Sequence, residues 1–354
     1  MHDRPVGLLA TVTRSGDRSS LGIRPPRWIP LGLALSLLVM LGPPAGASLA
    51  GATAPPAWVR VSVATVWYQR SSPRPVDWAA LGYPARIEVW LDRLSVGERF
   101  GLDSRIKTQV LFGEKVLVEG HWGSWSLIEV PEQRGSEYPR GITGWVPRTQ
   151  LSDIAPPVGR RQVIVGVARA WLHAGVDGTV GGRRFLLSFD TELPVVGSAP
   201  GYVIVGLPGG TTGAISAFAV QPVHQGAVSG AAVAAQAHRF LGNPYLWGGT
   251  SAFGYDCSGL VYSLFARFGR ILPRDTRDQW RVGHRVAPAD LRPGDLLFFA
   301  GPGGAGRVHH VAIYVGRGFM IDAPYTGASI EMIPMTSSPM WDEFTGAVRV
   351  ATEP

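Results

Sequence analysis

Residues 256–269 read DCSGLVYSLFARFG and hold the only cysteine of the chain, Cys257. Gly269 ends this stretch, and its apolar residues share one face of a helix: Leu260, Val261, Leu264, Phe265 and Phe268. The sulfur of Cys257 therefore lies at a helix N-terminus, where unpaired N–H groups and the helix dipole favour a thiolate. A buried, inert cysteine is the alternative, and a free thiol kept in an exported chain favours the functional interpretation.

A thiolate nucleophile requires a neighbouring base. His309 and His310 open an apolar strand at 308–316, and alternation puts their side chains on opposite faces. Only one of the two can face the thiol, and the alternation leaves the choice open. The chain offers three further candidates outside this strand, namely His173, His238 and His284.

A third polar group should orient the imidazole ring. The turn at 316–318 folds the following strand back as a hairpin, which brings Asp322 near the face of His310. A carboxylate there would accept the Nδ1–H and stabilise the imidazolium. The alternative for Asp322 is a solvent-facing strand residue.

The composition limits the class of protein. A chain of 354 residues is long enough for two or three domains, and 45% hydrophobic with 17% charged residues exclude a mainly disordered chain. One cysteine excludes an intramolecular disulfide and a multi-cysteine metal site. The formal charge of +7 suits an anionic partner such as a cell wall, but no Lys/Arg run interleaved with aromatics indicates nucleic acid.

The N-terminus is typical of an exported protein. Arginines precede an apolar run at 31–41, which is too short for an ordinary transmembrane helix and fits a secretory signal. The small residues at 45–47 fit a cleavage site, so residues 1–47 are predicted to be a signal peptide. A second cleavage site at 50–52 and an uncleaved N-terminal anchor are the alternatives.

The rest of the chain divides into three predicted domains. Residues 58–152 are rich in short strand patterns, and residues 160–223 repeat the same order of patterns more weakly. This repeat predicts a duplicated small β-barrel. Residues 224–354 carry helical patterns first and strand patterns afterwards, which predicts an α+β domain.

The first unit resembles a bacterial SH3 domain in its G-E-x-V turn at 113–116 and its G-W-V-P end at 144–147. The second unit lacks the G-W-V motif, so its SH3-like assignment depends on the repeat. Seven of the twelve tryptophans lie in 58–152. Most are expected in the barrel core or scattered on the surface, and an aromatic surface for glycan or peptide is the alternative.

Residues 240–335 resemble the NlpC/P60 family of papain-like cell-wall cysteine peptidases. Five motifs carry this resemblance in order: YLWGG at 245–249, DCSGL at 256–260, LPRDT at 272–276, LRPGDL at 291–296 and HVAIYVG at 310–316. The resemblance implies a papain-like fold, Cys257 as nucleophile and His310 as base. The third catalytic residue of the family, usually His, falls on Asp322, which departs from that pattern.

Two SH3-like units ahead of this domain resemble the γ-D-glutamyl–L-diamino-acid endopeptidases of the family. This resemblance implies that a free N-terminal L-Ala of a peptidoglycan stem peptide binds at Tyr245, Asp256 and Ser258, with Trp247 in the same motif. It also implies an acidic residue from the first SH3-like domain beside the ammonium, for which Glu114 is the candidate. Asp256 is alternatively a plain helix N-cap.

Arg274 has two predicted roles. It is suited to pairing with a substrate carboxylate, or alternatively to a structural ion pair with Asp275 or Asp278.

The sequence thus predicts an exported hydrolase that cuts the γ-D-glutamyl–diamino acid bond of stem peptides and requires no metal or organic cofactor. The oxyanion would be held by the Cys257 N–H and the Tyr245 hydroxyl. Two alternatives remain: a wall-binding protein with a degenerate peptidase domain, and an amidase or acyl transferase on the same fold.

Overall fold

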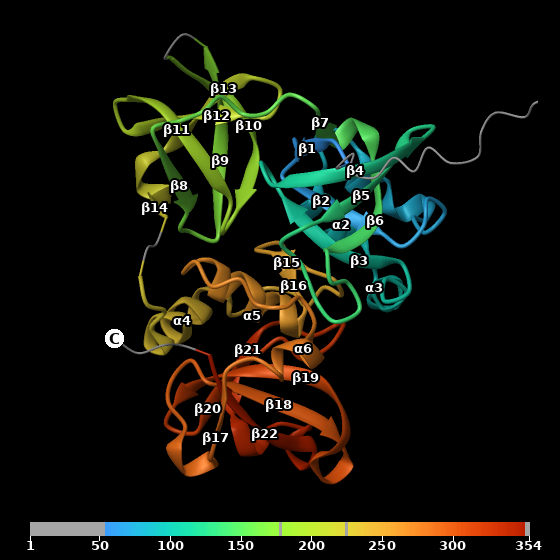
Figure 1. The fold of residues 1–354 in the computed structure, drawn as a ribbon, viewed down its shortest axis with the longest axis vertical. Helices are drawn as coiled ribbons and strands as arrows, with labels where there is room; N and C mark the ends of the chain where they lie inside the picture. Colours follow the sequence, from blue (N-terminus) through green and yellow to red (C-terminus); the bar gives the residue numbers. More distant parts are fainter. Residues whose placement is uncertain (1–53, 177–178, 224–225, 351–354) are drawn as a thin grey trace, which may run out of the picture. The chain divides into compact units, whose positions relative to one another are not determined.

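The computed structural model describes residues 54–176, 179–223 and 226–350, so the predicted signal peptide at 1–47 lies outside the described residues. Within those ranges, no helix combines the length and the apolar character that crossing a membrane requires. Strands dominate the described chain, and they form two seven-stranded sheets, a six-stranded sheet and a two-stranded ribbon (Figure 1).

The first sheet is antiparallel and has the strand order β3-β2-β6-β5-β4-β1-β7. Its strands are β1 (Pro56–Val59), β2 (Val63–Trp67), β3 (Ile106–Leu111), β4 (Lys115–Trp122), β5 (Trp125–Val130), β6 (Ile142–Pro147) and β7 (Leu151–Ser152). Three short helices interrupt it between β2 and β3, although the sequence predicts only strands there: α1 (Trp78–Leu81), α2 (Ile87–Arg93) and α3 (Val96–Phe100).

A buried carboxylate holds these inserted helices to the sheet. Asp77 is fully buried and accepts hydrogen bonds from the Arg74 Nε at 2.9 Å and from the Trp90 indole N–H at 2.9 Å. Trp90 of α2 in turn packs against Trp67 of β2, with ring centroids 6.1 Å apart. The insertion is therefore part of the core of the first sheet.

The second sheet repeats the topology of the first. Its order is β10-β9-β13-β12-β11-β8-β14, which matches the first sheet strand for strand when both are numbered from their own first strand. The strands are β8 (Arg161–Val165), β9 (Arg169–Val176), β10 (Thr179–Ser188), β11 (Glu192–Ala199), β12 (Tyr202–Leu207), β13 (Thr211–Ser216) and β14 (Val220–Pro222). The repeat recognised in the sequence is thus a repeat of strand order.

Helices precede strands in the C-terminal part, as predicted. The helices are α4 (Gly230–Ala237), α5 (Cys257–Ala266) and α6 (Thr276–Gln279), and β15 (Thr250–Ser251) pairs with β16 (Gly254–Tyr255) ahead of α5. The antiparallel sheet has the order β17-β22-β18-β19-β20-β21. Its strands are β17 (His284–Val286), β18 (Leu296–Gly301), β19 (Ala305–Gly316), β20 (Phe319–Asp322), β21 (Glu331–Pro334) and β22 (Phe344–Arg349).

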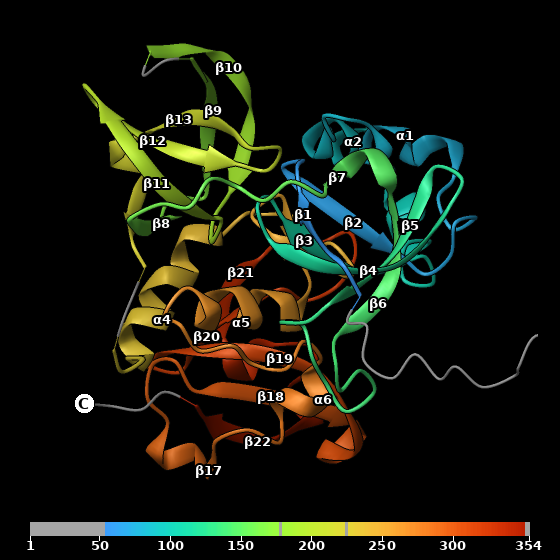
Figure 2. The same ribbon diagram turned by 45° about the horizontal axis from the view of Figure 1, so that its top comes forward.

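Helix α5 is buried on every side from Cys257 to Phe265, rather than along one apolar stripe. It lies beside β19 (Figure 2), and its apolar residues share one hydrophobic core with that strand. A helix enclosed in this way cannot shift without disturbing the packing around it. This enclosure fixes the position of its N-terminal residues.

We expect Asp77→Ala to lower the free energy of unfolding by about 2 kcal/mol at neutral pH, because the Arg74 and Trp90 donors lose their acceptor. Burial raises the pKa of Asp77, but the bonds from Arg74 and Trp90 outweigh burial and leave it lowered. The difference from wild type should therefore shrink as the pH falls through that lowered pKa. Denaturant unfolding at several pH values measures this difference in the free energy of unfolding.

Asp92→Ala is the matched control, because Asp92 of α2 is exposed. A loss of stability as large in Asp92→Ala as in Asp77→Ala would contradict the role given to the buried carboxylate.

Candidate active site

Cys257 is the first residue of α5, and its sulfur is nearly enclosed. Asp256 is the N-cap and accepts the Gly259 N–H at 2.6 Å, so it directs the first turn of the helix. A Cβ at Gly259 would lie 2.0 Å from the Gly249 carbonyl oxygen, so only glycine allows the 245–249 loop to pack on the helix. The Cys257 Sγ lies 3.6 Å from the Thr276 Oγ1 of α6.

The hairpin of β19 and β20 supplies His310 and Asp322. The His310 Nε2 lies 2.7 Å from the Asp322 Oδ1, and both side chains are buried. The other imidazole nitrogen of His310 is therefore available to Cys257, whereas the sequence argument had assigned Nδ1 to the carboxylate. His309 points to the opposite face, where its Nε2 lies 3.1 Å from a Glu343 carboxylate oxygen. The structure thus separates the two neighbouring histidines.

The electrostatics of this pair favour an imidazolium. Burial lowers the pKa of His310, but the Asp322 charge, the Cys257 thiolate and hydrogen bonds to both outweigh burial and raise it well above its usual value. Within the described ranges, the second oxygen of Asp322 accepts no hydrogen bond, so the carboxylate hydrogen-bonds to the His310 side chain alone. The arrangement therefore favours a charged imidazolium at His310 beside Cys257.

We expect Asp322→Asn to slow alkylation of Cys257 by iodoacetamide roughly 10-fold near pH 6, because loss of the carboxylate lowers the pKa of His310 and the imidazolium no longer stabilises the thiolate there. The rate of alkylation against pH measures the effect. Glu331→Gln is the control, since Glu331 pairs across β20 and β21 with Asp322 but is exposed. Identical pH profiles for wild type and Asp322→Asn would refute the coupling.

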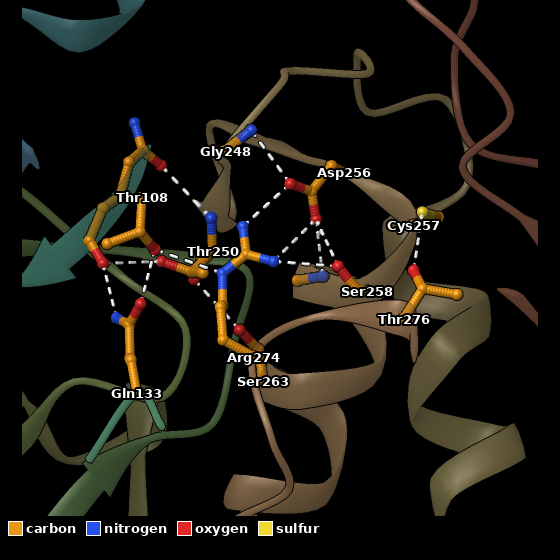
Figure 3. Close-up of polar contacts among 12 residues, drawn as sticks. Thr108, Gln133, Gly248, Thr250, Asp256, Cys257, Ser258, Ser263, Arg274 and Thr276 are labelled. Carbon is orange, nitrogen blue, oxygen red and sulfur yellow. Dashed lines mark hydrogen bonds and ion pairs between the residues drawn. The ribbon is translucent and has the colours of Figure 1, made fainter. Parts of the chain in front are cut away.

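Arg274 is buried and engaged with the residues on either side of Cys257 in the chain (Figure 3). Its Nη2 lies 2.8 Å from the Asp256 Oδ2, and its Nη1 lies 2.9 Å from the Ser258 Oγ. The structural ion pair predicted for Arg274 therefore exists, but its partner is Asp256 rather than Asp275 or Asp278. Because Asp256 and Ser258 engage both terminal nitrogens of the guanidinium, the contacts favour the structural ion pair over pairing with a substrate carboxylate.

Asp256 has the helix-capping role that the sequence left as an alternative, and its carboxylate also makes contacts outside the helix. Besides the Gly259 N–H and Arg274, its carboxylate accepts the Gly248 N–H at 2.9 Å. Gly248 has φ +72°, a left-handed conformation that suits glycine. The carboxylate thereby ties the 245–249 loop, the start of α5 and Arg274 together.

The first sheet completes this network through residues that the sequence analysis missed. The Thr108 Oγ1 of β3 accepts a hydrogen bond from the Arg274 Nε at 3.1 Å and is hydrogen-bonded to Gln133. The Gln133 amide donates to the Gln109 carbonyl at 2.7 Å, and this same carbonyl accepts the Thr250 hydroxyl at 3.1 Å. No motif marks these residues; only the buried face of β3 hints at them.

We expect Thr108→Val to lower the free energy of unfolding by about 1–2 kcal/mol, because the isosteric side chain leaves the Arg274 Nε and Gln133 without their partner. Chemical denaturation checks this value. Thr143→Val on β6 is the control, because Thr143 is only partly buried and lies outside the network. Equal stabilities of wild type and Thr108→Val would contradict a contribution from the contact.

A cavity of about 770 Å³ opens onto Cys257 and His310. It brings together the predicted binding residues from the C-terminal part: Tyr245, Trp247, Asp256, Ser258 and Arg274. Burial raises the pKa of Tyr245, and the charges of Cys257 and Asp256 raise it further, so its hydroxyl stays protonated and able to donate. The first sheet and its loops also line the cavity, with Tyr68, Asp103, Lys107, Glu137 and Tyr138.

Glu114 does not line this cavity, and its predicted place beside a substrate ammonium is wrong. Glu114 lies in the turn after the last residue of β3. The cavity is lined by the first residues of that strand, which are at its opposite end. Burial and the charge of Glu132 raise the pKa of Glu114 to about 8. The acidic residues that the first sheet does bring to the cavity are Asp103 and Glu137, which lie in the loops at its other end.

The site contains no evident metal centre. Among the residues that the structure describes, no three His, Cys, Asp or Glu side chains are grouped so that they could hold an ion.

Comparison with known proteins identifies relatives along most of the chain. Residues 242–349 match the model of the NlpC/P60 family. The gamma-D-glutamyl-L-lysine dipeptidyl-peptidase of Bacillus subtilis is 41% identical over 279 residues, which cover 78% of this chain and 93% of the relative. The protein of the same name from Bacillus cereus is 32% identical over 302 residues, covering 83% and 90%.

A solved structure shows the same arrangement. The crystal structure of an NlpC/P60 family protein from Bacillus cereus superposes with a TM-score of 0.77 at 30% identity, and the match covers 84% of this chain and all of that chain. The similarity therefore extends beyond the C-terminal part to the two preceding sheets.

Proposed function

We propose, since this chain belongs to the NlpC/P60 family, that it is a cysteine peptidase that hydrolyses the γ-D-glutamyl–diamino acid bond in peptidoglycan stem peptides. The observation that carries the proposal is the buried Cys257–His310–Asp322 group, which opens onto a cavity large enough for a short peptide. The names of the two Bacillus relatives, which match over nearly their whole length, support the choice of bond.

In the proposed reaction, the Cys257 thiolate attacks the γ-carbonyl carbon of the D-glutamyl residue. The Cys257 backbone N–H and the Tyr245 hydroxyl hold the oxyanion, and the His310 imidazolium gives its proton to the leaving amine. Water, deprotonated by His310, then hydrolyses the thioester and restores the free thiol. Asp322 holds the imidazole ring in place and stabilises its charged form.

We further propose that each seven-stranded sheet is an SH3-like barrel and that the C-terminal part is a papain-like catalytic domain, with boundaries at 58–152, 160–223 and 224–354. The identical strand order of the two sheets supports duplication of one small domain. A helix that starts at the cysteine and packs on an antiparallel sheet supports the papain-like assignment.

The free N-terminal L-Ala of the substrate is proposed to bind beside Tyr245, Asp256 and Ser258, with Trp247 at the cavity wall. Asp103 replaces Glu114 as the acidic residue for its ammonium group. Glu137, the other candidate in the loops of the first sheet, is already paired with Arg277. The Asp103 carboxylate has no hydrogen bond or ion pair with the described residues, so it is free to bind a cation.

Stem peptides occur in the cell envelope, so export through the predicted signal at 1–47 accords with this function. Peptidoglycan stem peptides are the proposed partner, and the proposal involves neither nucleic acid nor a cofactor.

We expect the full chain to release L-Ala-γ-D-Glu from L-Ala-γ-D-Glu-L-Lys or from its diaminopimelate counterpart, as measured by mass spectrometry. Cys257→Ala should lower kcat/KM roughly 10⁴-fold or more, because it removes the nucleophile. Acetylation of the N-terminal amine should raise KM if a free ammonium is bound.

Cleavage at another bond of the same peptides would favour an amidase or acyl transferase instead. Absence of cleavage of both peptides and of intact peptidoglycan would favour a wall-binding protein without activity.

A further inference from the structure

Lys107 lies on the wall of the catalytic cavity that the first sheet provides. It is the second residue of β3 and lines the same cavity as Cys257. The strand lies directly against the loop before the nucleophile, since a Cβ at Gly248 would meet the Ile106 Cγ2 at 2.8 Å and the Lys107 carbonyl carbon at 3.5 Å. The Gly248 N–H in turn holds Asp256, so Lys107 is anchored close to the start of α5.

The ammonium group of Lys107 sits between two aromatic rings. Its Nζ is 5.1 Å from the ring centre of Tyr68 and 5.3 Å from that of Tyr138, and both tyrosines line the cavity. The rings offer only partial negative charge to a cation. Within the described part of the chain, the ammonium makes no hydrogen bond or ion pair, and burial lowers the pKa of Lys107 with no carboxylate opposing it.

The arginines of the cavity differ from Lys107. Arg274 is committed to Asp256, and Arg277 is paired with Glu137. Arg307 of β19 has no ion pair among the residues described, but it is exposed, so water solvates its charge. Lys107 is thus partly removed from water and lacks a counter-charge, and this raises the free energy of its charged form. A bound anion would lower that free energy.

The proposed substrate carries a suitable anion. In a γ-linked D-glutamyl residue the side-chain carboxyl forms the scissile bond, so the α-carboxyl group is free and ionised. It lies only a few bonds from the ammonium of the preceding L-Ala. Asp103 and Lys107 present the opposite charges on one wall of the cavity, at the start of β3.

We propose that Lys107 binds the α-carboxylate of the D-glutamyl residue and makes the enzyme select D-glutamate over its α-amide, D-isoglutamine. This inference rests on the proposed function, and it adds a determinant of specificity on the first sheet. The α-amide has no charge to offer and would leave the half-buried ammonium unpaired. A charge-assisted hydrogen bond in such a place corresponds to a discrimination of about 10- to 100-fold.

The test compares kcat/KM for L-Ala-γ-D-Glu-L-Lys and for the same peptide with D-isoglutamine. Wild type should prefer the acid by about 10- to 100-fold, and Lys107→Met should reduce the preference to within about 3-fold by losing activity only on the acid. Lys107→Arg, which keeps the charge, should retain most of the preference. Arg307→Met is the matched control and should leave the preference unchanged.

A binding measurement separates this inference from turnover. In the Cys257→Ala background, calorimetry with the dipeptide L-Ala-γ-D-Glu and its α-amide should show the same preference, and Lys107→Met should remove it. Lys107→Gln is a second variant if Lys107→Met unfolds at a lower temperature than wild type.

Three results would overturn the inference. The first is equal cleavage of both peptides by wild type. The second is loss of the preference for the acid peptide in Arg307→Met but not in Lys107→Met. Both results leave the proposed function intact. The third is failure of wild type to cleave the acid and the amide peptides with either L-Lys or diaminopimelate, and intact peptidoglycan as well, which would remove the proposed function together with this inference.

Discussion

The buried pair of Asp256 and Arg274 is the contact on which the site depends. Asp256 caps the helix that starts at Cys257, and it holds the preceding loop through the Gly248 N–H. Arg274 neutralises this carboxylate and reaches across to Thr108 of the first sheet. A buried charge without its partner is costly, so the cap, the loop and the sheet are held as one unit.

This arrangement explains why the first sheet belongs to the active site. Its strand β3 supports Arg274 from one side and exposes Lys107 to the cavity beside it. The loop between β5 and β6 adds Tyr138 and Glu137 to the same cavity. Cys257 and His310 come from the C-terminal part alone, whereas the wall of the cavity is shared between the two parts.

Prediction from the sequence is correct where the signal is local. The family resemblance is confirmed by relatives that match along most of the chain, and the repeated strand order appears in both N-terminal sheets. Prediction failed for Glu114, because the G-E-x-V turn that contains this residue lies away from the cavity. It also missed the helices at 78–100, whose short apolar segments resemble strands in a chain rich in glycine and proline.

The sequence by itself determined the helix that begins at Cys257 and the hairpin that sets Asp322 beside His310, because each arises from residues close together in the chain. Only the tertiary structure decided that Thr108 supports Arg274, 166 positions away, and that Asp103 and Lys107 line the same cavity as Cys257. Such contacts depend on how separate sheets pack. The spacing of residues along one strand does not indicate which distant surface that strand will contact.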